Sequence, residues 1–154
     1  MNTIKLRPII TVEEKNTFVS EIQEAFQISY VSEFGEFEKQ VLPTEDIEES
    51  FNAKGAEAYI AEIGGERIGG AVIVIDDKTG YNSLHLLYVK SSAQNAGNGF
   101  KIWKAIEELH PETRIWETHT PYYDKRNIHF YVNRCGFKIV EFFNPKHKDP
   151  HQIS

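Results

Sequence analysis

Three apolar segments in succession, followed by a glycine-rich loop and an amphipathic segment, constrain the fold of this chain most strongly. They are AEAYIAEI, RIGGAVIVI and SLHLLYV, between residues 56 and 89. The first two meet at Gly64-Gly65-Glu66, a composition typical of a tight hairpin turn. The second is apolar on both faces, which predicts a central strand. After the loop, a helix ending near Leu109 directs Trp103 and Ile106 inward.

The segments before the hairpin predict one strand and two helices. TIKLRPII reads as a strand, and Pro8 favours the edge of the sheet. Thr11 and Glu14 match a capping box, which starts a helix with an apolar face. Pro43 precedes a second, short helix that ends at about Asn52.

The segments after the glycine loop complete an alternating pattern. TRIWETHT predicts a strand, a helix begins near Asn127, and FKIVEFF predicts a last strand. The order β-α-α-β-β-β-α-β-α-β predicts an α/β (α+β) fold with a mixed central sheet of about six to seven strands and helices on both faces. We expect a single domain over residues 1–154, with a polar tail from about residue 145.

Composition narrows the class of protein. The chain has 154 residues, of which 40% are hydrophobic and 26% charged, as in ordinary globular domains. Neither a membrane-spanning stretch nor a secretory signal stands out, so we expect a cytoplasmic protein without a membrane partner. The one cysteine cannot form an internal disulfide. A formal charge of −6 argues against nucleic acid as a partner and agrees with a cationic substrate.

The glycine loop is a candidate phosphate site. It runs from Gln94 to Phe100, with Gly97 and Gly99 inside it, and lies between a strand and a helix. Loop glycines and the unpaired amides of a helix start together attract phosphate. The dinucleotide fingerprint GxGxxG fails because Ile102 stands at its third glycine, and the P-loop lacks its GK[ST]. The alternative is a structural turn.

A second segment, residues 127–137, carries the pattern N-x-x-x-Y-x-x-x-x-G-F. Tyr131 lies on its apolar helical face, and Gly136 suits a left-handed helix terminator. Together, Gln-x-x-Gly-x-Gly and this pattern resemble the two signatures of the GCN5-related N-acetyltransferase (GNAT) superfamily. The resemblance covers about residues 57–144.

The resemblance implies that acetyl-CoA inserts between two splayed strands, here SLHLLYV and TRIWETHT. Main-chain groups near Leu87 and Val89 would pair with its pantetheine arm, and an amide near Val89 would hold the oxyanion. Amides of the glycine loop would bind the diphosphate, and Asn127 would contact the arm unless it caps the helix. Basic residues common at positions 95 and 96 are missing, and Lys101 or Lys104 would compensate. The loop residues concerned are Gln94, Asn95, Ala96, Gly97, Asn98, Gly99 and Phe100; Asn98 is also a candidate helix N-cap.

The resemblance also assigns catalytic roles. Tyr131 matches the family tyrosine that protonates the departing thiolate; the alternative is a tyrosine packed on the helix face. His85 is a candidate general base, because strict alternation puts it on the same strand face as Leu87 and its ordinary pKa suits neutral pH. Glu117 and His119 compete for that role, and His85 as a core residue remains an alternative.

The acceptor site is expected around the junction of the first two helices. Acidic and aromatic side chains there would hold a cationic amine, unless they form only a surface loop. They are Tyr30, Glu33, Phe34, Glu36 and Phe37. We expect no metal, including at His147 and His151, and a monomer or homodimer. The predicted function is N-acetyl transfer from acetyl-CoA to a primary amine; a non-catalytic acyl-CoA-binding domain and a fold relic without cofactor are the alternatives.

Overall fold

The computed structural model describes residues 3–94, 96–121 and 124–140, in two compact units. The first unit comprises residues 1–118 and the second residues 119–154, and each is described by itself. No helix in the described part of the chain is long and apolar enough to cross a membrane. The predicted polar tail from about residue 145, with His147 and His151, lies outside the described residues.

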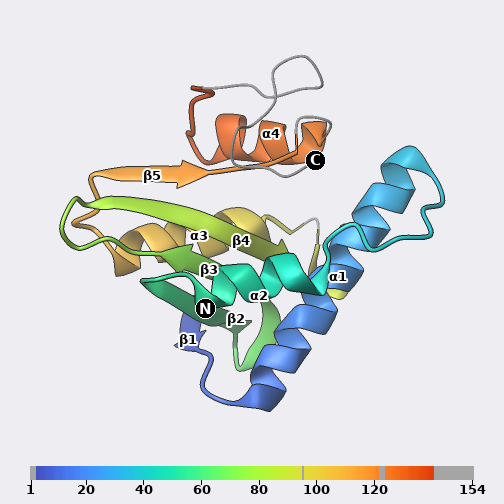
Figure 1. Cartoon of the computed structure of the whole chain (residues 1–154), viewed down its shortest axis with the longest axis horizontal. Coiled ribbons are helices and arrows are strands. Elements are labelled where there is room, and N and C mark those ends of the chain that lie inside the picture. The colour runs from blue at the N-terminus through green and yellow to red at the C-terminus, as the bar shows by residue number, and fades with distance from the viewer. Residues whose placement is uncertain (1–2, 95, 122–123, 141–154) are drawn as a thin grey trace. The chain divides into compact units, whose positions relative to one another are not determined.

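The first unit contains a five-stranded mixed sheet of strand order β1-β2-β3-β4-β5 (Figure 1). Adjacent strands from β1 to β4 are antiparallel, and β5 is parallel to β4. Its elements are β1 (Ile4–Pro8), α1 (Val12–Phe34), α2 (Thr44–Asn52), β2 (Ala56–Ile63), β3 (Glu66–Val74), β4 (Tyr81–Val89), the 3-10 turn η1 (Ser91–Ala93), α3 (Asn98–Leu109) and β5 (Ile115–Thr118). The predicted edge position of β1 and central position of β3 are confirmed.

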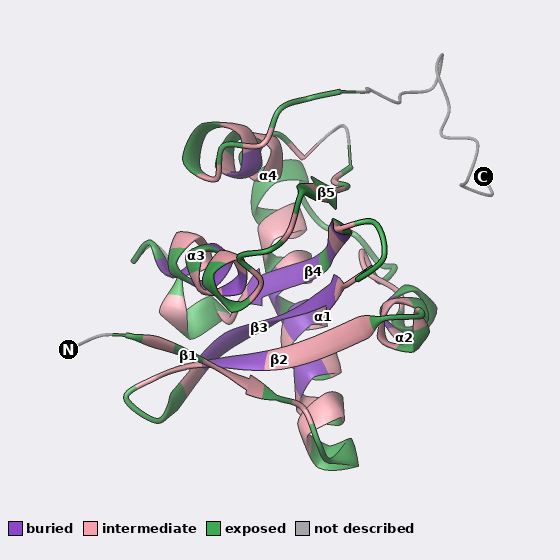
Figure 2. Cartoon of the chain, turned by 90° about the vertical axis from the view of Figure 1, so that its left-hand side faces the viewer, coloured by how far each residue is buried: buried purple, intermediate pink, exposed green. Residues whose placement is uncertain are grey.

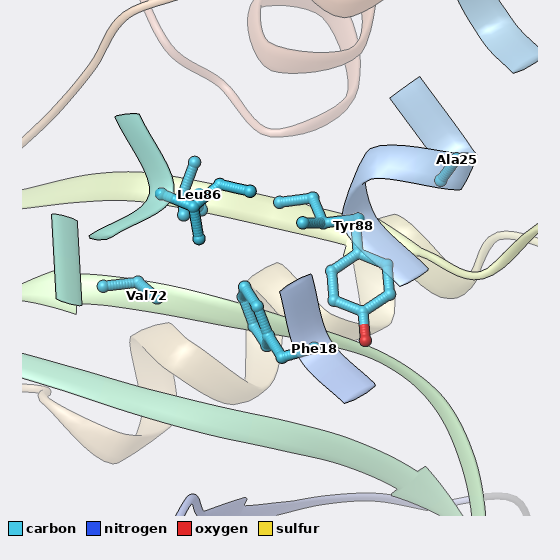
Figure 3. Packing of buried hydrophobic residues seen from close by; sticks show 7 residues of the cluster. Phe18, Ala25, Val72, Leu86 and Tyr88 are labelled. Atoms are coloured by element: carbon cyan, nitrogen blue, oxygen red, sulfur yellow. The ribbon is translucent and has the colours of Figure 1, made fainter. Parts of the chain in front are cut away.

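Helices cover both faces of the sheet, as predicted. Helices α1 and α2 lie on one face and α3 on the other, and the middle strands β3 and β4 carry most of the buried strand residues (Figure 2). Under α1, the ring of Phe18 makes edge-to-face contacts with Phe51 and Tyr88 at centroid distances of 5.1 Å each. Figure 3 shows the rings of Phe18 and Tyr88 side by side. Under α3, the rings of Trp103 and Trp116 of β5 make an edge-to-face contact with a centroid distance of 5.2 Å. These two apolar layers fix the strand that precedes the glycine loop.

Helix α1 starts at the predicted capping box. The side chain of Thr11 accepts from the amide of Glu14, and Glu14 accepts in turn from the amide of Thr11. Arg7 also contacts Glu14, and these hydrogen bonds lower the pKa of Glu14 to about 2. The helix runs on to Phe34, through a segment whose apolar pattern is irregular.

Strand β3 approaches β4 closely at a glycine. Gly69 pairs with Val89, and a Cβ atom at Gly69 would overlap the carbonyl oxygen of Tyr88. Only a residue without a side chain fits between these strands at that position. The packing of β3 therefore sets where the end of β4 lies.

The second unit contains α4 (Lys125–His129) and a π-helical turn, η2 (Phe130–Arg134). Asp124 caps α4 by accepting from the amide of Asn127 at 3.1 Å, so the helix begins two residues before the predicted start. Gly136 has φ 84°, which confirms the left-handed terminator. Residues 137–140 are not in a strand, and the rest of FKIVEFF lies outside the described residues. The described part of the chain therefore has five strands, fewer than predicted.

Candidate functional site

Strands β4 and β5 pair over only part of their length. The parallel ladder runs from Tyr81 opposite Ile115 to Leu84 opposite Thr118. The hydroxyl of Thr118 donates to the carbonyl of Leu84 at 3.0 Å, at the end of the ladder. Strand β4 continues to Val89, so its residues from Leu86 to Val89 pair with β3 on one edge while β5 has already ended.

Main-chain groups of Leu87 and Val89 lie on the edge of β4 that β5 does not pair with beyond Leu84. The amide of Lys90 donates to the carbonyl of Ile68 in β3 at 2.8 Å. Successive residues of a strand direct their main-chain groups to opposite edges, so the groups of Val89 and Leu87 face away from β3. The side chain of Leu87 is buried, whereas its main chain lies at the edge.

The glycine loop after β4 is closed by its own side chains. Gln94 donates through Nε2 to the carbonyl of Val89 at 3.1 Å. Asn98 donates through Nδ2 to the carbonyl of Ala93 at 2.8 Å. Gly97 takes the left-handed conformation, with φ 73°. Asn95 lies outside the described residues. The loop is therefore a compact turn that connects η1 to α3.

The first turn of α3 presents amides towards the loop. Gly97 is the N-cap, and the first bond within the helix runs from the amide of Lys101 to the carbonyl of Gly97 at 3.2 Å. Among the described residues, no protein acceptor meets the amides of Asn98 and Gly99. Asn98 is the first helical residue and not the N-cap, contrary to one expectation, because Gly97 adopts the required backbone turn. Phe100 completes this turn, and Ala96 lies exposed before it.

Helix α3 carries two basic residues. Lys101 is exposed on the first turn of α3. The Nζ atom of Lys104 lies 3.3 Å from Oε1 of Glu107, and the Lys104 side chain is half exposed. Its charge is therefore partly balanced within the helix. The dipole and amides of α3, with Lys101, form the described features that favour an anion.

A β-bulge changes the orientation of His85. Val72 pairs with Leu86 and Ile73 pairs with Leu84, which leaves His85 without an opposite residue. Its Nδ1 lies 3.3 Å from the hydroxyl of Ser50 in α2, and the side chain is exposed. The prediction that His85 shares a face with Leu87 is wrong, because a bulge interrupts alternation. His85 instead lies on the α2 side of the sheet.

Comparison with known proteins identifies the family. The sequence pattern described as "Acetyltransferase (GNAT) family" matches residues 19–137. The chain belongs to the GNAT acetyltransferase family. It is 49% identical over 135 residues to the uncharacterized protein YrkN of Bacillus subtilis, covering 87% of this chain and 73% of that protein.

Solved GNAT structures share the fold at low sequence identity. The putative acetyltransferase YycN of Bacillus subtilis superposes with a TM-score of 0.70 at 12% identity, covering 92% of this chain and 96% of that chain. A GNAT acetyltransferase from Elizabethkingia anophelis with acetyl-CoA bound superposes with a TM-score of 0.65 at 16% identity, covering 92% of this chain and 80% of that chain. The PaiA N-acetyltransferase of Thermoplasma acidophilum, in complex with coenzyme A, has a TM-score of 0.65 at 16% identity, covering 91% of this chain and 92% of that chain.

The predicted acceptor residues of this GNAT chain lie at the end of α1 and just after it. The ring of Tyr30 packs against those of Phe34 and Phe37 at centroid distances of 4.9 and 5.0 Å, tilted by 42° and 41°. Glu33 is on the last turn of the helix, and Glu36 is exposed in the following loop. These side chains therefore gather at one junction, and their role in binding an amine stays a prediction.

Sequence reasoning missed the residue that shapes this junction. Gln27 donates to the carbonyls of Phe37 and Lys39 at 3.2 and 3.0 Å and accepts from the amide of Val41 at 2.9 Å. One side chain thus fixes three points of the loop between α1 and α2. Its signal in the sequence is only a polar residue on a helix, which usually faces solvent.

In the second unit, Tyr131 lies within the π-helical turn. Its ring packs against Phe130 and Phe137 at 5.1 and 5.7 Å. Asn127 is in the first turn of α4, and its amide is capped by Asp124. π-helical turns occur frequently at functional sites, which agrees with the predicted importance of this segment. The acid role of Tyr131 and the cofactor contact of Asn127 stay predictions.

Proposed function

We propose that this protein is an N-acetyltransferase that moves an acetyl group from acetyl-CoA to a primary amine of a small cationic acceptor. The observation that carries the proposal is an edge of β4 that β5 leaves unpaired beyond Leu84 and that leads, through η1 and the glycine loop, into the first turn of α3. An extended amide-bearing ligand can pair with such an edge as an added strand, and its diphosphate can meet the helix start. Acetyl-CoA has this combination of parts.

In this proposal, residues of the first unit bind and polarise the thioester. Main-chain groups of Leu87 and Val89 pair with the pantetheine arm, and the amide of Val89 donates to the thioester carbonyl. Amides of residues 94–100, with the charge of Lys101, hold the diphosphate. Because the helix amides are fixed before binding, little reorganisation accompanies the reaction.

Transfer proceeds by direct attack in a ternary complex. The acceptor is held by Tyr30, Glu33, Phe34 and Glu36, whose acidic and aromatic groups suit a cation. His85 takes a proton from the ammonium, and its contact with Ser50 orients the ring. The amine nitrogen then bonds to the carbonyl carbon, and the carbon–sulfur bond breaks. Tyr131 gives its proton to the departing thiolate, with Asn127 holding the arm. The nitrogen of the intermediate loses its second proton, which returns Tyr131 to its neutral form directly or through solvent.

We also infer that the two compact units act as one acetyltransferase domain. The family pattern spans residues 19–137 and therefore includes parts of both units.

The test is release of free thiol from acetyl-CoA in the presence of polyamines, amino acids, aminoglycosides and peptide N-termini. We expect amine-dependent thiol release with one acetylated amine formed for each thiol. His85→Gln should lower kcat, whereas the matched control His110→Gln, at a histidine whose ring contacts Glu57 and Glu112, should not. Binding of acetyl-CoA without amine-dependent thiol release would refute catalysis and support an acyl-CoA-binding domain. The few basic residues near the loop are the observation that favours this second function.

A further inference from the structure

The end of β4 has lost the support of one neighbouring strand. From His85 to Val89, β5 does not pair with β4, and this edge is where the proposed cofactor arm binds. A strand held along only one edge can shift unless other elements fix it. Since the amides of this segment must meet a ligand in fixed geometry, something else must hold it.

Helix α1 supplies one such contact through Tyr88. This residue is 3% exposed, and its hydroxyl donates to Oε1 of Glu21 at 2.7 Å. The ring lies beside Phe18 between α1 and the strands (Figure 3). Burial, and then the hydrogen bond to Glu21, raise the pKa of Tyr88 above its ordinary range. Tyr88 is therefore a neutral donor to the carboxylate at physiological pH.

Arg67 of β3 holds the same carboxylate. Its Nε donates to Oε1 of Glu21 at 3.0 Å, and its Nη2 donates to Oε2 at 2.7 Å. Burial alone would raise the pKa of Glu21, but the hydrogen bonds from Arg67 and Tyr88 lower it. Glu21 is thus an ionised acceptor that joins α1 to both β3 and β4.

A second contact lies just past the end of β4. The hydroxyl of Ser91 donates to Oε1 of Glu24 at 3.0 Å. Glu21 and Glu24 are three residues apart and so project from the same side of α1. Their partners, Tyr88 and Ser91, stand on either side of Val89 and Lys90. Two carboxylates of one helix turn therefore hold both ends of the segment that leads into the glycine loop.

We propose that Glu21 and Glu24 are positioning residues for the acetyl-CoA site. They hold the end of β4 and the first residue of η1 in place of the missing strand partner. The proposal rests on the proposed function, because the geometry matters only if this edge and loop bind the cofactor. Both glutamates act through Tyr88 and Ser91 and do not touch the cofactor themselves. Displacements of about 1 Å at such a site reduce rates strongly.

Tyr88→Phe tests the first contact because it keeps the ring and removes only the hydroxyl. Tyr59→Phe is the matched control, since the hydroxyl of Tyr59 donates to Oε1 of Glu57 at the same 2.7 Å, in β2. Hydrogen exchange of the free protein is measured at the amide of Lys90, which donates to Ile68, and of Ala93, which donates to Lys90. The amide of Ile9, bonded to Ala58, reports on the distant edge of the sheet.

We expect Tyr88→Phe to speed exchange at Lys90 and Ala93 about tenfold relative to Ile9, while Tyr59→Phe does not. The KM for acetyl-CoA should rise several-fold with the KM for the amine unchanged. Ser91→Ala should also speed exchange at Lys90 and Ala93 and raise the KM for acetyl-CoA. The effects of Tyr88→Phe and Ser91→Ala should not be additive in the double variant. Equal exchange in Tyr88→Phe and Tyr59→Phe, or a KM that changes equally in both, would overturn the proposal.

The proposed function and the positioning role of the glutamates can be refuted separately. Acetyl-CoA that does not bind the wild-type protein refutes the proposed function, and exchange at Lys90 and Ala93 then decides alone whether α1 fixes this segment. Normal exchange in Tyr88→Phe together with active wild-type enzyme refutes only the positioning role. If Tyr88→Phe is too unstable to study, Ser91→Ala, at an exposed residue, gives the same readouts.

Discussion

Replacing Gly69 by alanine should damage cofactor binding through the packing of two strands. The added Cβ would overlap the carbonyl oxygen of Tyr88 and lie 3.1 Å from Cα of Val89. Backbone atoms cannot rotate away as a flexible side chain does, so the end of β4 must move by about 1 Å to restore ordinary contact. Overpacking of this kind typically costs about 1–3 kcal/mol of folding free energy.

This displacement would also move Val89, whose amide is proposed to donate to the thioester carbonyl. We therefore expect the KM for acetyl-CoA of Gly69→Ala to rise about ten- to a hundredfold. Gly64→Ala is the control, because Gly64 has φ 58° and nothing within 4 Å of the added atom. Its left-handed backbone costs alanine about 1–2 kcal/mol without moving β4.

Urea unfolding and steady-state kinetics of both variants separate the two effects. The structure predicts comparable losses of stability in Gly69→Ala and Gly64→Ala, and a raised KM for acetyl-CoA in Gly69→Ala alone. Unchanged cofactor kinetics in a folded Gly69→Ala protein would refute the reasoning, since the strand end could then move without consequence for the site.

Three further perturbations probe other contacts. Burial would lower the pKa of His110, but hydrogen bonds to Glu57 and Glu112 raise it. Protonated His110 therefore contributes its full share to the free energy of unfolding below about pH 6.5, and this contribution declines as the pH rises through the pKa of the folded state. Urea unfolding should show the free-energy advantage of the wild-type protein over His110→Gln shrinking as the pH rises above about 6.5, and a constant advantage would contradict this. Thr11→Ala should lower the free energy of unfolding by about 1 kcal/mol, measured by denaturation, because the helix cap is lost. Lys101→Ala should weaken acetyl-CoA binding about two- to fivefold by calorimetry, an effect that vanishes at high salt because the charge is exposed.

Much of the fold is predictable from the sequence because the signals are local. The capping box at Thr11, the turn at Gly64 and the helix ending at Leu109 each depend on residues near one another in the chain. The extension of α1 to Phe34 is not visible in its apolar periodicity. There the helix is supported by side chains such as Gln27, whose partners lie in the following loop.

The candidate site was predictable where it depends on backbone conformation and less so where it depends on strand register. The loop around Gly97 and the terminator Gly136 follow from the conformational freedom of glycine. The bulge at His85 does not, because LHLLYV is apolar on both faces and fits either register. The contact between Tyr88 and Glu21 joins residues 67 positions apart, and no spacing rule predicts it.

Titration of isotope-labelled protein with acetyl-CoA, followed by the amide resonances of Gly97, Asn98 and Gly99, tests the central claim most directly. The proposed site predicts saturable shifts at these three amides with one equivalent of ligand. Amides of the hairpin turn at Gly64 and Gly65 should stay in place. Resonances of Gly97 to Gly99 that do not move at saturating acetyl-CoA would contradict the assignment of this helix start as the diphosphate site.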